Sequence, residues 1–521
     1  MFTFGKSRRP ASALSGVVVA AIAAAVLPAS AALAQPSVPA RYAQQHLDWQ
    51  QCEKDSPLEC AAMTVPRDWH HPDAGADITV EVSRHRASDP AKRRGVLMMA
   101  AGGPGGKGLM RPARLVKDSP SVGAAYDVVG FDQRGVGRST RAVCENDAEF
   151  ADFLDGDFRD RSPAALRRVV DRSRKFVESC RSRSGDLLPY LNTDQTARDM
   201  DLFRSLLGER KISYYGPSYA TMIGAYYATL FPQRVERAVL DSNIAFDGSW
   251  ESFMKDQPMS FQRRFEKDFL PWLAQYDGVY HYGRTAAEAK ANWERLRGEL
   301  GRRPVTVEGV VVGPNQLDSG TIQAMYNAGQ GFGPLAAALA ALDHWDVAKP
   351  EEKATVRQLF GGYADSSFFA QYFSVTCNDT PWTRDMDHWI RRSGEDTRER
   401  PLAGARELAF ASVCAAWPTS PAPKVKVTGA GLPATLMLNS VHDPATYYEA
   451  ALRAHRALRG SRLVTVTGGG DHGQYLAGNA CVDGVVDAYL LAGTVPAGDT
   501  SCAAGPLPVP EGARAAASAA K

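Results

Sequence analysis

The sequence predicts an α/β fold with a mostly parallel central sheet, and two observations lead to this prediction. First, short apolar runs at residues 95–101 and 126–132 show no polar alternation, which is typical of strands buried on both faces. Second, a helix is expected at 193–207 between such strands, and strand patterns return at 433–439 and 462–466. This alternation favours parallel strands joined by helical crossovers.

The turn at residues 216–220 is the most informative local feature of the chain. It reads Gly-Pro-Ser-Tyr-Ala and lies between a short strand and an apolar helix at 222–231. The pattern matches the nucleophile elbow G-x-S-x-G of α/β-hydrolases, with Ala220 in place of the last glycine. Gly216 and Ala220 are small enough to let the helix pack close to the strand. Although the pattern alone is a weak signal, its place between strand and helix predicts an α/β-hydrolase fold with Ser218 as the nucleophile.

The chain also contains candidates for the two partners that a catalytic serine needs, a histidine base and an acid that orients it. In α/β-hydrolases both follow late strands, in the chain order serine, acid, histidine. His472 follows the last predicted strand through a glycine-rich turn, and Asp443 follows the strand before it. Asp241, which ends the strand after the elbow, and Asp471, which adjoins His472, are the alternatives for the acid. We favour Ser218, Asp443 and His472 as the catalytic residues.

A tetrahedral intermediate needs two hydrogen-bond donors for its negative oxygen. We expect one donor to be the backbone N–H of Tyr219, which follows the candidate nucleophile. The other is expected from the glycine-rich loop 102–106, which follows a predicted strand, and Gly103 is the preferred residue. A phosphate-binding loop is the alternative, but no Gly-Lys-Ser/Thr follows at the required spacing.

The composition is that of an ordinary globular protein, and the N-terminal residues indicate export. Residues 1–34 have a basic start, a short apolar stretch and a small-residue cleavage site, which is typical of a signal peptide. The net charge of the 521 residues is +2, and the leader contains three basic and no acidic residue, so the remainder has a charge of −1. Because no basic patch or further long apolar run is present, we expect neither nucleic acid nor a membrane as a partner. We expect a secreted monomer, either free or associated with the cell wall, and the export route stays open.

Eight cysteines follow the leader, and an even number in an exported protein indicates disulfide bonds. Many connectivities are possible, and pairing between sequence neighbours is the one we expect. No C-x-x-C spacing is present, so a zinc site is not expected. The expected bridges are Cys52–Cys60, Cys144–Cys180, Cys377–Cys414 and Cys481–Cys502.

The length of the chain suggests a core with a large insertion. Residues 35–245 and 428–505 are predicted to form the two parts of the α/β-hydrolase core. Long helical patterns predict a helical cap over 246–427, inserted between them. Residues 506–521, rich in proline and alanine, are predicted to be a disordered tail.

Several motifs resemble those of the prolyl-aminopeptidase group of α/β-hydrolases, and most closely those of secreted tripeptidyl aminopeptidases. They lie at residues 102–106, 131–139, 216–220 and 471–473, with further support from 49–66, 375–379 and 478–483. Two positions depart from the family pattern: Ala220 stands where glycine is usual, and Ala101 where histidine is frequent. Neither departure removes a candidate catalytic residue.

The resemblance implies a serine exopeptidase that releases short peptides, typically tripeptides, from substrates with a free N-terminus. Such an enzyme needs an anion to hold the ammonium group of the substrate, and Glu251, Glu266 and Asp268 of the expected cap are candidates. No cofactor or metal is implied. A secreted esterase or lactonase for small molecules would use the same triad, and a non-catalytic binding protein on a hydrolase scaffold is a third alternative.

Overall fold

The structure of the protein is a computed structural model that describes residues 38–361 and 365–513. The expected signal peptide at 1–34 lies outside these ranges. Within the described ranges, no helix is both long and apolar enough to cross a membrane.

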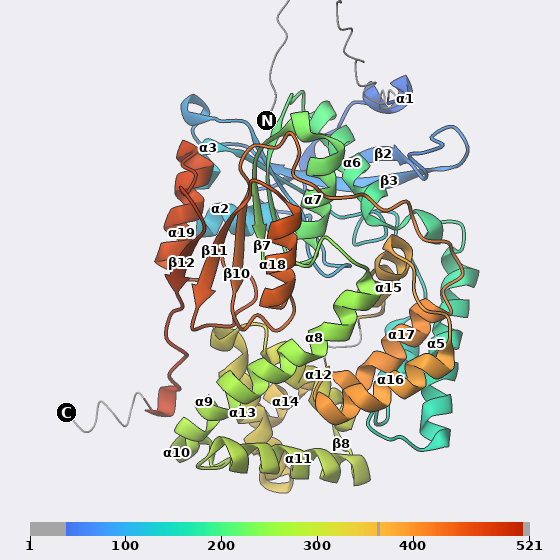
Figure 1. Ribbon diagram of the computed structural model, residues 1–521, viewed down its shortest axis with the longest axis vertical. Coiled ribbons are helices and arrows are strands. Elements are labelled where there is room, and N and C mark those ends of the chain that lie inside the picture. The colour runs from blue at the N-terminus through green and yellow to red at the C-terminus, as the bar shows by residue number, and fades with distance from the viewer. Residues whose placement is uncertain (1–37, 362–364, 514–521) are drawn as a thin grey trace, which may run out of the picture. The chain divides into compact units, whose positions relative to one another are not determined.

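One large sheet runs through the described residues (Figure 1). Its strands are β1 (Gln50–Gln51), β2 (Glu59–Pro66), β3 (Asp77–His85), β4 (Val96–Met99), β5 (Asp127–Phe131), β6 (Ile212–Pro217), β7 (Val235–Asp241), β10 (Leu436–Ser440), β11 (Arg462–Thr467) and β12 (Thr500–Ala503). The strand order is β1-β2-β3-β5-β4-β6-β7-β10-β11-β12. The pairs from β1 to β5 are antiparallel, whereas those from β5 to β12 are parallel. The predicted mostly parallel sheet is therefore confirmed.

The ends of the central strands lie at one edge of this sheet. Pro217 at the end of β6 pairs with Asp241 at the end of β7, and Asp241 pairs in turn with Leu438 of β10. On the other side of β6, Met99 at the end of β4 pairs with Tyr215. The turns that follow these strands therefore meet at the carboxyl edge of the sheet, where α/β proteins place their sites.

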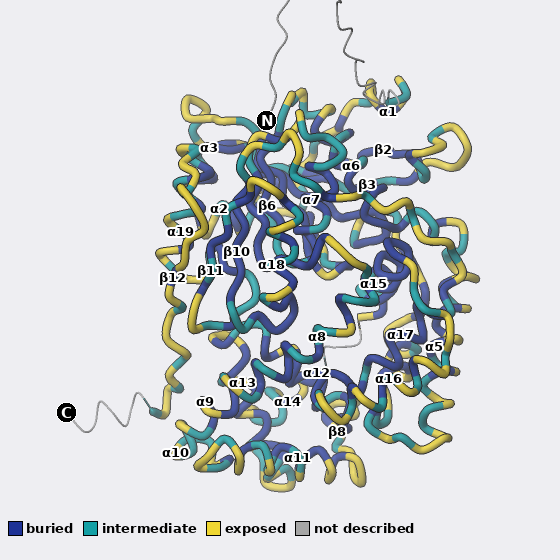
Figure 2. Tube along the Cα trace, viewed as in Figure 1, coloured by how far each residue is buried: buried dark blue, intermediate teal, exposed yellow. Residues whose placement is uncertain are grey.

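Helices cover both faces of the sheet, and its strands are largely buried (Figure 2). The helices packed on it are α2 (Arg111–Asp118), α3 (Pro120–Ala125), α6 (Thr193–Leu206), α7 (Ala220–Leu230), α18 (Tyr448–Ala457) and α19 (Ala480–Asp487). On one face, α2, α3 and α19 share an apolar cluster with the strands. On the other, α7 comes so close that a Cβ atom at Gly224 would lie 2.4 Å from the Tyr214 ring. This close approach fixes the start of α7 against the end of β6.

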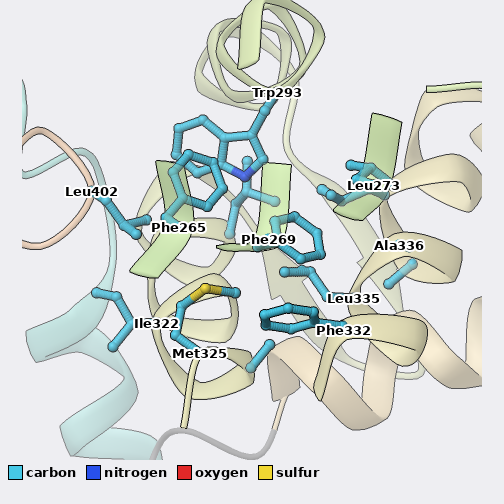
Figure 3. Close-up of a cluster of buried hydrophobic side chains, with 14 of the residues drawn as sticks. Phe265, Phe269, Leu273, Trp293, Ile322, Met325, Phe332, Leu335, Ala336 and Leu402 are labelled. Atoms are coloured by element: carbon cyan, nitrogen blue, oxygen red, sulfur yellow. The ribbon is translucent and has the colours of Figure 1, made fainter. Parts of the chain in front are cut away.

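The chain between β7 and β10 is mostly helical and has a hydrophobic core of its own. Phe265, Phe269, Trp293 and Phe332 pack together in this core, as Figure 3 shows. A short hairpin of β8 (Val305–Val307) and β9 (Val310–Val312) interrupts the helices. The helices are α8 (Trp250–Arg264), η4 (Phe265–Phe269), α9 (Leu270–Gln275), α10 (Asp277–Tyr280), α11 (Ala286–Arg302), α12 (Pro314–Ala324), α13 (Ala328–Asp343), α14 (Pro350–Gly361), α15 (Ser366–Asp379), α16 (Met386–Glu399) and α17 (Glu407–Ala415).

Two helices that precede β6 in sequence also pack on this helical part. They are α4 (Asp147–Leu154) and α5 (Pro163–Ser184). The ring of Phe150 stacks on Phe369 with centroids 4.6 Å apart, and Phe176 meets Phe373 edge-on at 5.3 Å. The helical part therefore also contains residues that the sequence analysis assigned to the first part of the core.

All eight cysteines form disulfide bonds, and the four expected pairings are confirmed. Cys52–Cys60 joins the residue after β1 to β2, and Cys481–Cys502 joins α19 to β12. Cys144–Cys180 ties the chain before α4 to α5, and Cys377–Cys414 ties α15 to α17. Two of the bridges therefore lie in the helical part of the protein.

The chain after β12 differs in part from the predicted disordered tail. Residues 506–513 are described, and the carbonyl oxygen of Pro508 accepts a hydrogen bond of 2.7 Å from Nε1 of the buried Trp272. The hydrogen bond to a backbone carbonyl thus holds a segment that is poor in large apolar residues. Amino-acid composition alone cannot predict such a contact. The predicted tail beyond residue 513 lies outside the described residues.

Candidate active site

Ser218 lies in a sharp turn between β6 and α7. Its φ is +62°, in the left-handed region that non-glycine residues adopt at a cost of about 1–3 kcal/mol. The turn is held because the N–H of Ser218 donates to the carbonyl oxygen of Asp241 at 2.8 Å, and the Tyr214 hydroxyl donates to the Ala220 carbonyl at 2.7 Å. A Cβ at Gly216 would lie 2.5 Å from that hydroxyl, so the turn requires glycine there. The local geometry is that of a nucleophile elbow.

The imidazole of His472 is hydrogen-bonded to Asp443. Nδ1 of His472 lies 2.9 Å from Oδ1 and 3.0 Å from Oδ2 of Asp443. The carboxylate also accepts the N–H groups of Ala445 and Thr446 at 2.9 and 2.8 Å, and its side chain is fully buried. With Nδ1–H donated to Asp443, Nε2 of His472 is the nitrogen left to accept a proton. Ser218 and His472 line the same cavity.

Burial and charge act in opposite directions on His472. Burial lowers the pKa of the imidazole, but the charge of Asp443 and the hydrogen bond to it outweigh burial, so the pKa lies above the usual 6.5. The pair therefore stabilises the imidazolium that forms when His472 takes a proton.

The two other acids considered from the sequence have different partners. Asp241 accepts the backbone N–H groups of Gln474 and Tyr475 at 2.9 and 3.0 Å, so it holds the loop after His472 rather than its ring. Asp471 accepts the N–H of Ala328 at 2.9 Å. Of the three acids, Asp443 is the one whose carboxylate contacts the imidazole.

The glycine-rich loop after β4 lies directly against the elbow. A Cβ at Gly102 would lie 2.8 Å from Cβ of Ser218 and 2.9 Å from the Pro217 carbonyl oxygen, so only glycine fits. Gly103 has a φ of +117° and lines the cavity beside Ser218. Tyr219 immediately precedes α7, whose N-terminal end carries partial positive charge. Tyr219 thus follows the candidate nucleophile directly, and Gly103 belongs to the loop that packs against it and borders the same cavity.

The cavity has a volume of about 1090 Å³ and lies between the sheet edge and the helical part. The residues that the helical part contributes to this cavity were not among those predicted from the sequence. The carbonyl oxygen of Tyr326 accepts the N–H of His472 at 2.7 Å, and the two rings meet edge-on with centroids 5.2 Å apart. Other lining residues from this part include Trp250, Phe253, Met254, Phe368, Tyr372 and Phe410.

A buried arginine connects the helical part to the His472 loop. Arg264 at the end of α8 is 1% exposed and donates to Asp268 at 2.6 Å and to Asp471, the neighbour of His472. Asp268 also contacts Nδ1 of His442 at 3.0 Å. The arginine thus neutralises two acids and fixes the loop that carries the candidate base.

Arg264→Met is expected to destabilise the fold by about 3 kcal/mol, because it removes the buried cation that faces the largely buried Asp268 and the partly exposed Asp471. We also expect a lower kcat, since the His472 loop loses its anchor. Urea unfolding and steady-state kinetics measure the two effects. Arg263→Met is the matched control: Arg263 pairs with the half-exposed Glu449 at 2.9 Å, and its loss should cost about 0–1 kcal/mol. Equal effects of the two substitutions would contradict the assigned role of Arg264.

The structure does not support Glu251 and Glu266 as ligands for a substrate amine. Glu251 accepts the N–H of Thr383 at 2.6 Å, and Glu266 pairs with Lys290. Neither borders the cavity, and Asp268 is occupied by Arg264 as described above. Helical periodicity cannot tell which face of an inserted helix turns toward a site, so these two positions could not be checked from the sequence alone. Among the described residues, the acids that border the cavity are Asp118 and Asp365.

Comparisons with known proteins agree with this geometry. Residues 95–297 match the family model of the alpha/beta hydrolase fold, and residues 400–502 match that of TAP-like proteins. The tripeptidyl aminopeptidase of Streptomyces lividans is 37% identical over 90% of this chain and 89% of its own length. Serine protease Hip1 of Mycobacterium tuberculosis is 28% identical over 95% of this chain and 99% of its own length. Carboxylesterase B of the same species is 30% identical over 85% of this chain and 86% of its own length. The chain therefore belongs to the tripeptidyl aminopeptidase family of serine hydrolases with the α/β-hydrolase fold.

Proposed function

We propose that the protein is a secreted serine exopeptidase that releases short peptides, tripeptides above all, from free N-termini. The observation that carries the proposal is His472, which is hydrogen-bonded to the buried Asp443 and borders one cavity together with the strained Ser218. The relatives named tripeptidyl aminopeptidase support the choice of a peptide substrate.

In this mechanism the Ser218 hydroxyl attacks the carbonyl carbon of the scissile peptide bond. Nε2 of His472 takes the hydroxyl proton, and Asp443 stabilises the resulting imidazolium. The negative oxygen of the intermediate is bound by the N–H groups of Tyr219 and Gly103. When the C–N bond breaks, His472 gives the proton to the leaving amine, and the released acyl group stays on Ser218. Water, activated by the same histidine, then hydrolyses this ester.

The helical part supports exopeptidase rather than endopeptidase action. It covers the carboxyl edge of the sheet and forms one side of a cavity of about 1090 Å³, to which it contributes aromatic side chains such as Phe253 and Phe368. A site of this size suits a short peptide, and not an internal segment of a folded protein. We propose that the helical part limits the released product to a few residues.

Export is the remaining element of the proposal. Four disulfide bonds form between cysteines that are neighbours in the sequence of the described chain, and such bonds persist in oxidising, extracellular surroundings. Together with the signal-peptide pattern of residues 1–34, this supports secretion.

Product analysis of one peptide and its N-acetylated twin tests the proposal. We expect mass spectrometry to find an N-terminal tripeptide released from the unblocked peptide and no release from the acetylated one. Equal cleavage of the two peptides, or cleavage at internal bonds, would contradict exopeptidase action.

A secreted esterase is the second candidate, because carboxylesterase B is 30% identical to this chain. The triad chemistry is the same, so the substrate decides between the two functions. If kcat/KM for short acyl esters is at least 100-fold above that for an unblocked tripeptide anilide, the esterase function replaces the peptidase function.

A further inference from the structure

One wall of the cavity carries positive charge next to the loop of His472. We call it the α2 wall, and it consists of Arg111, Arg114, Leu115, Tyr475 and Leu476. Arg111 lies one helical turn before Arg114 and Leu115 on α2, and the last two residues follow His472 by three and four residues. Leu115, Tyr475 and Leu476 belong to or pack on the apolar cluster below the sheet edge, so the wall is rigid.

Arg111 is a half-buried cation without an internal carboxylate. Within the described residues, the acceptor for its guanidinium is the carbonyl oxygen of Lys107, 3.3 Å from Nε. Residues outside the described ranges contain no aspartate or glutamate that could pair with it. The buried arginines Arg134, Arg264 and Arg297, in contrast, each donate to an aspartate.

The surroundings of Arg111 also disfavour the charged form of its guanidinium. Burial, and then the like charge of Arg114, lower the pKa of Arg111, although Tyr215 acts in the opposite direction. Asp118, in the last turn of α2, has its carboxylate 3.4 Å from Nε of Arg114. It therefore partly neutralises that exposed arginine. A desolvated guanidinium that lines an active-site cavity is suited to bind an anionic group of the substrate.

The position of the α2 wall indicates which part of the substrate reaches it. His472 gives its proton to the leaving amine, so the peptide beyond the scissile bond must pass this histidine. The residues that follow His472 form the wall together with α2. One residue of extended peptide spans about 3.3–3.6 Å, so a carboxylate one or two residues beyond the bond remains close to the wall.

We propose that Arg111, with Arg114 beside it, forms a subsite for a carboxylate of the leaving peptide. The subsite favours short peptides, whose free C-terminal carboxylate lies near the cleaved bond. An acidic side chain just beyond the bond offers the same chemistry. The inference rests on the proposed peptidase function.

The test compares kcat/KM for three unblocked substrates that share the first three residues. The first is a tetrapeptide with a free C-terminal carboxylate, the second is its C-terminal amide, and the third is the amide with aspartate as fourth residue. We expect the wild-type enzyme to prefer the free acid over the amide by about 10- to 100-fold, as for a charge-assisted hydrogen bond. In Arg111→Gln this ratio should fall to about 1, and Arg111→Lys should keep part of it.

If the aspartyl amide is as good as the free acid, the subsite accepts either source of carboxylate. If it is no better than the plain amide, the C-terminal carboxylate is the ligand.

Lys117→Gln is the control, because Lys117 is an exposed cation of the same helix that does not line the cavity. It should leave the ratio at the wild-type value.

A tripeptide anilide, whose leaving group has no carboxylate, separates the proposed peptidase function from the proposed carboxylate subsite. If the wild-type enzyme does not cleave the anilide or the tetrapeptides, the proposed function fails. If it cleaves them without a preference for a carboxylate, or if Arg111→Gln leaves the preference intact, the subsite is overturned.

Discussion

Replacing Ser218 by alanine is expected to lower kcat for an unblocked tripeptide anilide by about 10⁶-fold. In serine hydrolases the loss of the nucleophile costs about this much, because the covalent route is removed as a whole. The fold should survive: the turn is held by backbone hydrogen bonds and by the Tyr214 hydroxyl, none of which uses the Ser218 side chain.

Steady-state kinetics measure this loss, and thermal melting verifies that the variant is folded. Ser182→Ala, at an exposed position of α5, serves as the control and should leave kcat unchanged. A folded Ser218→Ala protein that retains more than a hundredth of the wild-type kcat would show that another residue performs the chemistry.

Asp443→Asn is the substitution with the next largest expected effect, a loss of about 10⁴-fold in kcat. Oδ1 of asparagine can still accept the N–H groups of Ala445 and Thr446, so the loop keeps its shape. The amide NH₂ then faces Nδ1 of His472 and donates to it, which moves the ring proton to Nε2. In this tautomer Nε2 cannot accept the proton of Ser218.

The same substitution is expected to shift the pH profile. The base must be neutral, so kcat/KM of the wild-type enzyme should fall as the pH drops through the raised pKa of His472, above 6.5. Asparagine removes the negative charge that raises this pKa, so the residual activity of the variant should fall only at lower pH. A profile whose acid limb stays at the wild-type pH would contradict the role of Asp443.

The features that the sequence reveals are local ones. The elbow could be predicted because five consecutive residues and a close strand–helix contact define it, and Gly216 shows that contact in the structure. Asp443 and His472 could be proposed because parallel strands align their carboxyl ends, so residues just after β10 and β11 must lie near Ser218. The disulfide pairing could be predicted because each bridge joins cysteines that follow one another in the sequence, 8 to 37 residues apart.

The features that escaped prediction depend on how the helical part sits on the sheet. Tyr326 and Arg264 contact the His472 loop across about 150 to 200 residues of chain, and no periodicity records such a contact. For the same reason α4 and α5 were assigned to the core although they pack on α15 and α17. Glu251 and Glu266 were proposed as amine ligands because they lie on predicted helices of the cap. The sequence could not show whether their side chains point toward the cavity.

Mapping the site of a fluorophosphonate adduct tests the central claim, that Ser218 is a nucleophile activated by His472 and Asp443. Intact-protein and peptide mass spectrometry should find one adduct, on the peptide that contains Ser218, with no adduct in Ser218→Ala and slow labelling in Asp443→Asn. The absence of any adduct on the folded wild-type protein, or an adduct on another residue, would contradict the account.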